Sequence, residues 1–405
     1  MEKLKNIYEH NNDNISSDQA GRVIDTFLFD ESQIMKSKRR GFCEDIEEDF
    51  GSKTLGSKNS ITVDSTKGFI SQLCIRFEVA GTLTVSAHNL AYAMIESYKI
   101  SIGGEDFDYH GDSLFQYICT VNTDQETRDQ LGNFAGDAAS SSIPGICYAY
   151  LLGPGSNCVI NAYNDPSKQI FFPLGKCNTD MVIEVKLKAG TEVEKTSTNI
   201  SLTTMKLCYK NIIFEKELKD TEPYQNQPKP QKFLYSAILP KILTKIKTMT
   251  TVASTNYDLA AIDNVSKEDG ELLWIGFNTS TAAQYDTNKD PFVTENIINL
   301  EMFQSTTSIY KHETAREAEF LHLNAFKTIN KFPLTSTYFY NIPFSSQYNW
   351  LPNSKLSKGI NCNKANLSIC FDGVTSATIQ YTIFAVYRYL ITIDGKKKCK
   401  HVSKI

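Results

Sequence analysis

Histidine and carboxylate side chains gather in one short stretch, EDFDYHGD, where they could bind a metal ion or exchange protons. His110 stands there among Asp106, Asp108 and Asp112, and His88 is the nearest other histidine. Calcium loops need oxygen ligands at alternating positions around a glycine, and this stretch fits that spacing poorly. A local hydrogen bond of His110 within a turn explains the same residues. We therefore predict no metal site here.

Other catalytic signatures are missing from the sequence. It contains no GxSxG nucleophile elbow, phosphate-binding loop or dinucleotide-binding fingerprint. Gly153-Pro154-Gly155 is expected to be a turn, because a phosphate site needs a following helix and CVINAY has no helical pattern. The sequence thus predicts no catalytic residue and no cofactor.

The ten cysteines are scattered without a CxxC pair, so a zinc site is not expected. Cys74, Cys208 and Cys370 each lie inside an apolar, strand-like run. Unpaired cysteine behaves as a small apolar residue, and such usage is typical of a reducing compartment. We expect buried free thiols, with a disulfide framework as the alternative.

The length, composition and net charge favour some classes of protein and exclude others. A chain of 405 residues with 41% hydrophobic content can form two domain cores. Its formal net charge of −4 argues against a dedicated nucleic-acid binder, which normally carries a basic excess. No apolar run approaches the roughly 20 residues that span a bilayer, and the polar start MEKLKNIYEHNNDN lacks a secretory signal. We expect a soluble chain made in a cytosol.

Residues 1–59 are predicted to form a polar N-terminal arm. Ser17-Asp18 could cap a helix, but its apolar positions are sparse, so it would be marginal without a partner. A basic cluster before an acidic run comprises Lys36, Lys38, Arg39 and Arg40. The arm is either a flexible terminus or a segment that orders on a neighbouring subunit or a membrane.

Residues 60–217 read as short strands separated by turns, which is typical of an all-β sandwich or barrel. One strand is expected to end at Ile102, because Gly103-Gly104 can adopt the positive φ of a tight reversal. Leu131 to Gly145 is predicted to be a loop. The expected strands are ITVDS, FISQLCIRFEVA, TLTVSAHNLA, MIESYKISIGG, CYAYLLG, CVINAY, QIFFPL, MVIEVKLKA and NISLTTMKLCYKNIIF.

Three prolines mark residues 218–235 as a linker: Pro223, Pro228 and Pro230. A second β-rich series then fills residues 236–405. It includes ELLWIGFN, ENIINLEMFQSTTSIY, FLHLNAFKTI, STYFYNIPF, ANLSICFDG, TIQYTIFAVYRYLITIDG and a basic tail. KHETAREAEF is expected to add a helical turn between strands. The halves look like two copies of one architecture.

Three segments, in this order along the chain, resemble the double jelly-roll major capsid proteins of tailless icosahedral double-stranded DNA viruses. The first is a strand ending in Gly-Gly and followed by His-Gly. The second is an apolar-Pro-Leu segment, and the third is a Gly-X-Asn pattern before a long aromatic strand. The matching residues are Glu96, Ile102, Gly103, Gly104, Asp108, His110, Gly111, Pro173, Leu174, Gly359, Asn361, Leu367, Leu390, Ile393 and Gly395.

The resemblance implies two consecutive eight-stranded jelly rolls and a structural role in a virion assembled in the host cytoplasm. Three chains would form a pseudo-hexagonal capsomer that contacts neighbouring capsomers and minor capsid or penton proteins. Family termini face the interior, so the N-terminal basic cluster and Lys396, Lys397 and Lys398 become candidates to face an internal viral membrane. No specific nucleic acid is implied.

Two alternatives remain. A double jelly-roll scaffold that shapes a viral membrane would share the fold, and the short chain favours the mature shell subunit over it. A two-jelly-roll protein that binds or hydrolyses glycans would need paired carboxylates in a cleft, and the sequence nominates no such pair.

Overall fold

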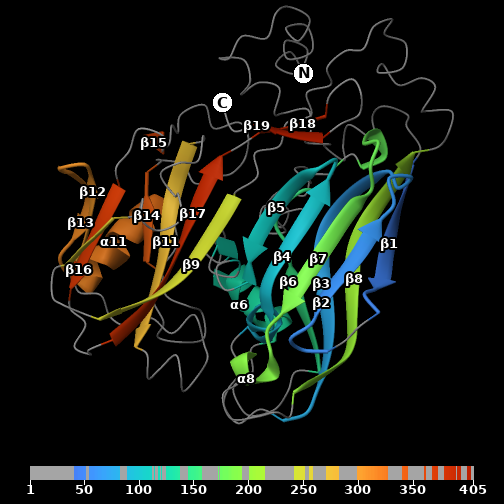
Figure 1. Ribbon diagram of the computed structural model, residues 1–405, viewed down its shortest axis with the longest axis horizontal. Helices are drawn as coiled ribbons and strands as arrows, with labels where there is room; N and C mark the ends of the chain where they lie inside the picture. The colour runs from blue at the N-terminus through green and yellow to red at the C-terminus, as the bar shows by residue number, and fades with distance from the viewer. Residues whose placement is uncertain are drawn as a thin grey trace, which may run out of the picture.

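The computed structural model shows a β-rich molecule made of two bodies side by side (Figure 1). The structure describes residues 41–51, 54–82, 89–111, 114, 117, 118, 120, 125–136, 145–156, 172, 174–193, 200–214, 241–250, 255–258, 271–281, 299–326, 340–344, 360, 361, 367–372, 378–388, 390–393 and 399–402.

The first body is a sandwich of two four-stranded antiparallel sheets, with strand orders β1-β8-β3-β6 and β2-β7-β4-β5. The pairs are nested, since β1 pairs with β8, β2 with β7, β3 with β6 and β4 with β5. A long hairpin wrapped in this way is a jelly roll. Its strands are β1 (Gly41–Asp49), β2 (Lys58–Val63), β3 (Phe69–Ala80), β4 (Ile95–Ile102), β5 (Glu105–His110), β6 (Ile146–Tyr150), β7 (Met181–Leu187) and β8 (Ser201–Phe214).

The second body repeats this nesting: β9 pairs with β17, β10 with β16, β11 with β14 and β12 with β13. Its sheets have the orders β14-β11-β17-β9 and β10-β16-β12-β13, and the short β15 (Ile360–Asn361) also pairs with β11. The strands are β9 (Lys241–Thr250), β10 (Thr255–Asp258), β11 (Glu271–Thr281), β12 (Asn299–Gln304), β13 (Thr307–His312), β14 (Tyr340–Pro343), β16 (Leu367–Asp372) and β17 (Thr378–Arg388). The prediction of two consecutive jelly rolls is confirmed.

Few described helices accompany the strands: α4 (Leu90–Ala93), α6 (Gln125–Ala135), the 3₁₀ turn η5 (Leu174–Lys176), α8 (Gly190–Val193) and α11 (Ala315–Phe326). Helix α6 lies between the fifth and sixth strands of the first jelly roll. Helix α11 occupies the same place in the second, between β13 and β14. The duplication therefore extends to the connection that carries a helix.

Alternation of side chains explains the core of the first jelly roll. In β4, Tyr98, Ile100 and Ile102 are buried and the intervening residues are partly exposed, because successive side chains point to opposite faces of a strand. The predicted reversal after Ile102 is present. Gly103 and Gly104 have φ of 65° and 88°, and Ile102 pairs with Glu105 across a two-residue turn. Positive φ at both central positions is the geometry of a hairpin turn that suits twisted strands.

The predicted boundary of the N-terminal arm at residue 59 is wrong, because β1 belongs to the first jelly roll. It pairs with β8 along its whole length, from Gly41 opposite Phe214 to Asp49 opposite Lys206. Its acidic sequence hid this pairing. Two of its carboxylates are partly buried and find donors on β8: Glu48 accepts from Tyr209 (2.6 Å) and Glu44 from Asn211 (3.5 Å).

Three segments predicted as strand or loop are helical. Leu90 and Ala91 lie in α4, and Leu131 lies in α6 within the predicted loop. FLHLNAF continues α11, which buries Ala318, His322 and Phe326 at helical spacing. The helical turn expected in KHETAREAEF is present. Thr314 accepts from the backbone N–H of Glu317 (3.1 Å), a capping signature readable in the sequence.

The expected C-terminal strand and basic tail form two elements in addition to β17. Strand β18 (Leu390–Ile393) pairs with β19 (Cys399–Val402), from Leu390 opposite Val402 to Ile393 opposite Cys399. Lys396, Lys397 and Lys398 lie between these strands, outside the described residues. The predicted N-terminal helix, the basic cluster 36–40, CVINAY and the 218–235 linker also lie outside them.

Gly111 is required by close backbone packing, which gives a physical reason for one residue of the His-Gly motif. A Cβ added there would overlap the carbonyl oxygen of Ile95 and lie 2.9 Å from that of Tyr92. Gly104, by contrast, has open space around it but a φ of +88°.

We predict that Gly111→Ala destabilises the protein by about 3 kcal/mol, because neither carbonyl can yield without moving the start of β4. Gly104→Ala is the matched control and should cost only about 1 kcal/mol, the penalty of a left-handed conformation. Denaturant unfolding measures both. Equal losses would contradict the packing argument.

Candidate functional site

The described residues bring no catalytic group together, and the most developed site is the contact between the two jelly rolls. Its centre is Trp274 on β11, which is 1% exposed. Tyr117 of the first jelly roll stacks on Trp274 with ring centroids 5.6 Å apart and planes 3° apart. Phe326 of α11 meets the same indole edge-on at 5.4 Å. Trp274 is therefore held between both bodies.

A hydrogen bond beside the stack joins the same two bodies. Asn341 on β14 donates through Nδ2 to Thr120 Oγ1 at 2.9 Å, and both residues are buried. Asn341 pairs with Gly276, two positions from Trp274, so both side chains belong to one face of the β14-β11-β17-β9 sheet. Separating the buried amide of Asn341 from its partner would cost free energy, so this hydrogen bond favours one relative orientation of the two bodies.

The apolar core is continuous across the contact. The buried cluster of the first jelly roll extends through Tyr117 to Trp274 and Phe326 of the second. The edge strands β5 and β9 run beside each other at this junction (Figure 1). A shared apolar core restricts the relative motion of two domains. The two bodies thus share one core at this contact.

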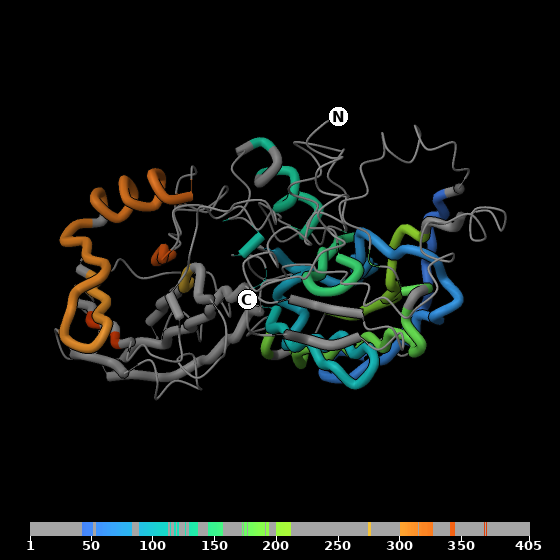
Figure 2. The backbone as a smooth tube through the Cα atoms, turned by 90° about the horizontal axis from the view of Figure 1, so that it is seen from above, coloured from blue at the N-terminus to red at the C-terminus, as the bar shows by residue number. Residues whose placement is uncertain are grey.

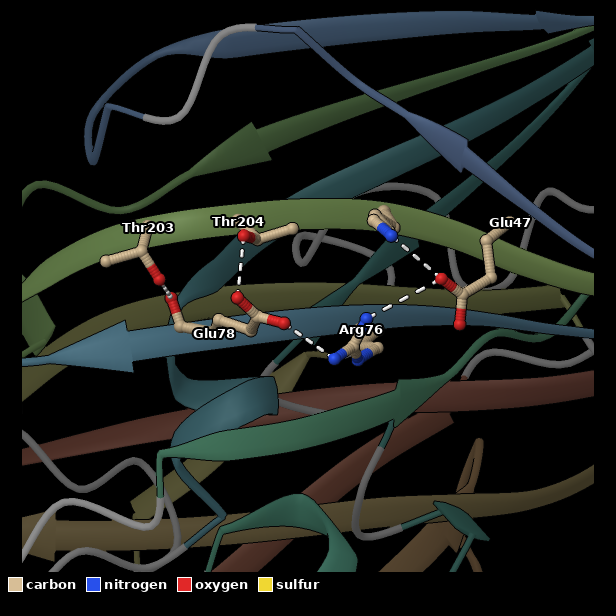
Figure 3. Close-up of polar contacts among 6 residues, drawn as sticks. Glu47, Arg76, Glu78, Thr203 and Thr204 are labelled. Carbon is tan, nitrogen blue, oxygen red and sulfur yellow. Dashed lines mark hydrogen bonds and ion pairs between the residues drawn. The ribbon is translucent and has the colours of Figure 1, made fainter.

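The outer face of the β1-β8-β3-β6 sheet carries a network of paired charges (Figure 3). Arg76 donates to Glu78 (2.6 Å) and lies 3.6 Å from Glu47, which also meets Lys206 at 2.8 Å. Thr204 donates to the second oxygen of Glu78 at 2.7 Å. The bond from Lys206 is the main cause that holds the pKa of Glu47 below its usual value. Only 17% of the Arg76 side chain is exposed.

Asp106, Asp108 and His110 lie on the outer face of the other sheet, where they alternate as exposed residues of β5. The hydrogen bond from Ser101 (2.6 Å) is the main cause that lowers the pKa of Asp106, and Lys99 adds to it at 3.4 Å. These residues form a solvated charged face. His88 and Asp112 lie outside the described residues.

The residues of the capsid-like motifs are dispersed through the fold. Ile102 is buried in β4 and Leu174 in the turn η5, whereas Asp108 and His110 are exposed. Asn361 pairs with Glu271 through β15, and Leu367 begins β16. Leu390 and Ile393 begin and end β18. Pro173, Gly359 and Gly395 lie outside the described residues. Their shared role as a family motif stays a prediction.

The cysteines fit the expectation of buried thiols only in part. Cys147 and Cys177 are buried, and burial raises the pKa of each to about 12. Cys74 and Cys208 face each other on β3 and β8, but Cys208 is half-buried, as is Cys370. A hydrogen bond between these two free thiols is the main cause that raises the pKa of Cys74 and lowers that of Cys208. They lie on the sheet's outer face, where alternation places Arg76 and Lys206.

Neither a metal-ligand cluster nor a membrane-spanning helix occurs in the described residues. No group of three or more His, Cys, Asp and Glu side chains in this part of the chain could hold a metal ion. Within the same residues, no helix is long and apolar enough to cross a bilayer.

The comparisons with known proteins match the fold and not the sequence. No family model and no curated protein matches. VP54 of the virus PBCV-1, as fitted into a reconstruction of the virophage Sputnik, superimposes with a TM-score of 0.66 at 11% identity, covering 90% of this chain and 97% of that one. A chain of the PBCV-1 capsid gives 0.64 at 11% identity over the same shares. The Faustovirus major capsid protein gives 0.59 at 8% identity, covering 97% and 100%.

The chain shares the fold of viral capsid proteins. The double jelly roll spans nearly all of each matched chain, so the likeness includes the side-by-side placement of both sandwiches. At this level of identity the match concerns the fold alone, and the residues of the Tyr117–Trp274 contact are features of this chain.

Sequence reasoning did not find that contact. Local patterns in the sequence give Tyr117 no role and place Trp274 only in the expected strand ELLWIGFN. The one available signal was that Trp274 is one of just two tryptophans in the chain. Its partner, 157 positions earlier in the sequence, cannot be inferred from local periodicity.

We predict that Trp274→Ala destabilises the chain by about 3–5 kcal/mol, because it removes the largest side chain of the junction. It should also split unfolding into two calorimetric transitions. Phe77→Ala, in the core of the first jelly roll, is the control that should lower stability while keeping a single transition. One transition in both variants would contradict the view that Trp274 couples the bodies.

Proposed function

We propose that this chain is the major structural subunit of an icosahedral viral shell, and that three copies form a pseudo-hexagonal capsomer. The observation that carries the proposal is the fixed, side-by-side pairing of two jelly rolls with the same nested topology. Three such chains around a three-fold axis present six similar wedges. A block of that shape tiles a facet by three-fold symmetry alone.

The charged outer faces of the first jelly roll support a structural role. Paired charges such as Arg76–Glu78 and Lys99–Glu184 keep the sheets soluble and contribute little stability each. The similarity to the PBCV-1 and Faustovirus capsid chains extends over the whole length needed for such a block. Neighbouring capsomers, together with minor capsid or penton proteins, are the partners that this role requires, and the virion is its place.

We predict that the purified protein has a mass three times the 45.6 kDa of the chain. Obligate contacts of this kind bury large areas and survive dilution. Multi-angle light scattering gives the mass, and negative-stain images of the same fraction should show hexagonal particles. A stable monomer that never assembles would overturn the proposal and favour a glycan-binding role.

One long edge of the molecule is the proposed interior side. The start of β1 and the β18–β19 hairpin both lie along this edge, at the top of Figure 1. The sequence places Lys36, Lys38, Arg39 and Arg40 just before β1, and Lys396, Lys397 and Lys398 between the hairpin strands. Both basic clusters are thus next in sequence to elements of this edge, and an internal membrane with anionic lipids would attract them at roughly 1 kcal/mol per charge.

Vesicle flotation tests the membrane contact. We predict that the protein floats with vesicles containing phosphatidylserine at low salt, and that replacing Lys396, Lys397 and Lys398 by Gln weakens this. Lys58→Gln, on the outer face of the β2-β7-β4-β5 sheet, is the control. Equal flotation of all three proteins, or none with the native chain, would reject a membrane-facing edge.

A further inference from the structure

The exposed large apolar side chains of the described residues fall into two groups, one on each jelly roll. Phe320 (63% exposed) and Leu323 (46%) stand three positions apart on α11 of the second. Phe134 (48%) on α6 and Ile146 (45%) on β6 belong to the first. Phe134 packs edge-on against Tyr148 of β6, with ring centroids 6.4 Å apart. Phe134, Ile146 and Tyr148 are called the β6 strip below.

Phe320 and Leu323 correspond in position to Tyr117 and Thr120 of the first jelly roll. Each jelly roll connects its fifth and sixth strands by a helical segment. Tyr117 and Thr120 follow the end of β5 at His110 by seven and ten residues. Phe320 and Leu323 follow the end of β13 at His312 by eight and eleven. The two pairs thus occupy matching places in the duplicated fold.

The pair in the first jelly roll makes the intramolecular contact. Tyr117 stacks on Trp274 and Thr120 accepts from Asn341, so this connection docks on the outer face of the β14-β11-β17-β9 sheet. The corresponding sheet of the first jelly roll is β6-β3-β8-β1. Its outer face presents Ile146 and Tyr148 opposite Glu78 and Arg76, with Phe134 packed beside them.

Phe320 and Leu323 do not contact this face within one chain. Helix α11 lies in the second body with β12 and β13, whereas β6 and α6, which carry the strip, lie in the first (Figure 1). Helices α6 and α11 lie along the same side of both bodies (Figure 2). Suppose that another copy packs its second jelly roll against the first jelly roll of this chain, in the way that the two jelly rolls pack within one chain. Helix α11 of that copy would then reach the β6 strip of this chain.

We infer that Phe320 and Leu323 of one copy dock on the β6 strip of the next copy, and so repeat between subunits the contact of Tyr117 and Thr120 within one. This is a head-to-tail interface, which closes into a ring when the rotation allows. It rests on the proposed capsomer and adds the residues that build it. Pairing of α11 with α11 would instead give a two-fold dimer and leave the β6 strip uncovered.

The first experiment replaces the apolar pair in the full-length protein. Phe320→Ser with Leu323→Ser should raise the subunit dissociation constant by about 30-fold or more, as loss of an interface anchor does. Phe320→Leu with Leu323→Met should retain the trimer, and Thr307→Ala at the exposed β12–β13 turn is the neutral control. Circular dichroism checks that each variant is folded.

The second experiment tests which surfaces meet. A chain carrying Ile146→Cys and Phe320→Cys, mildly oxidised with copper–phenanthroline, should give covalent dimers and trimers on non-reducing gels. Each single variant should give neither, which also controls for the native cysteines. Abundant dimers from Phe320→Cys alone would show α11 pairing with itself and overturn the inference.

The outcomes separate the inference from the proposed function. A native trimer that the Ser variants leave intact, with no cross-linking in the double Cys variant, would reject the docking of α11 and leave the capsomer standing. A native monomer would reject both. Loss of the trimer in the Ser variants, together with cross-linking only in the double Cys variant, would support both.

Discussion

The stacking of Tyr117 on Trp274 is the interaction that turns two sandwiches into one unit. The first jelly roll buries an apolar core between its own two sheets, and the second has the same nested strand pairing. Their relative placement depends on the aromatic junction, on the Thr120–Asn341 hydrogen bond and on the neighbouring β5 and β9 edges. Edge strands invite uncontrolled pairing, and burying two of them against each other removes that hazard.

The same connection between the fifth and sixth strands is used differently in the two halves. In the first half Tyr117 is buried against Trp274, whereas in the second Phe320 and Leu323 are exposed on α11, although Phe326 of the same helix is buried against Trp274. Duplication explains this difference, since a chain of two similar bodies satisfies one junction internally and leaves one free at each end. In the inferred docking, these free surfaces are the ones that meet between copies. The charged outer faces expose no large apolar patch elsewhere on the described sheets of the first jelly roll, which disfavours non-specific association there.

The sequence predicted what local periodicity determines. The alternation of Tyr98, Ile100 and Ile102, the Gly103-Gly104 turn and the bounds of β3 follow from patterns of side chains and from glycine's conformational freedom. Strand β1 was missed because Glu44 and Glu48 are stabilised by donors on β8, far along the chain. The helix at FLHLNAF was missed because Leu and Phe suit strands as well, although Thr314 and Glu317 marked its start.

Tertiary partners explain what remained beyond prediction. No local pattern pairs Tyr117 with Trp274, and none shows that Phe320 is exposed and Trp274 buried. The motif residues point to a fold and not to chemistry, because Gly111 is required by the carbonyl oxygens of Ile95 and Tyr92 that pack against it. Gly111 is thus a packing position, and the surfaces that we infer to meet between copies came from the structure and not from the sequence.

Cryo-electron microscopy of the purified particle would show directly how the bodies are arranged between chains. We predict a three-fold ring of six jelly rolls in which first and second bodies alternate, with β5 beside β9 within each chain and α11 beside β6 between chains. A particle with separated bodies, or a two-fold dimer joined through α11, would contradict it.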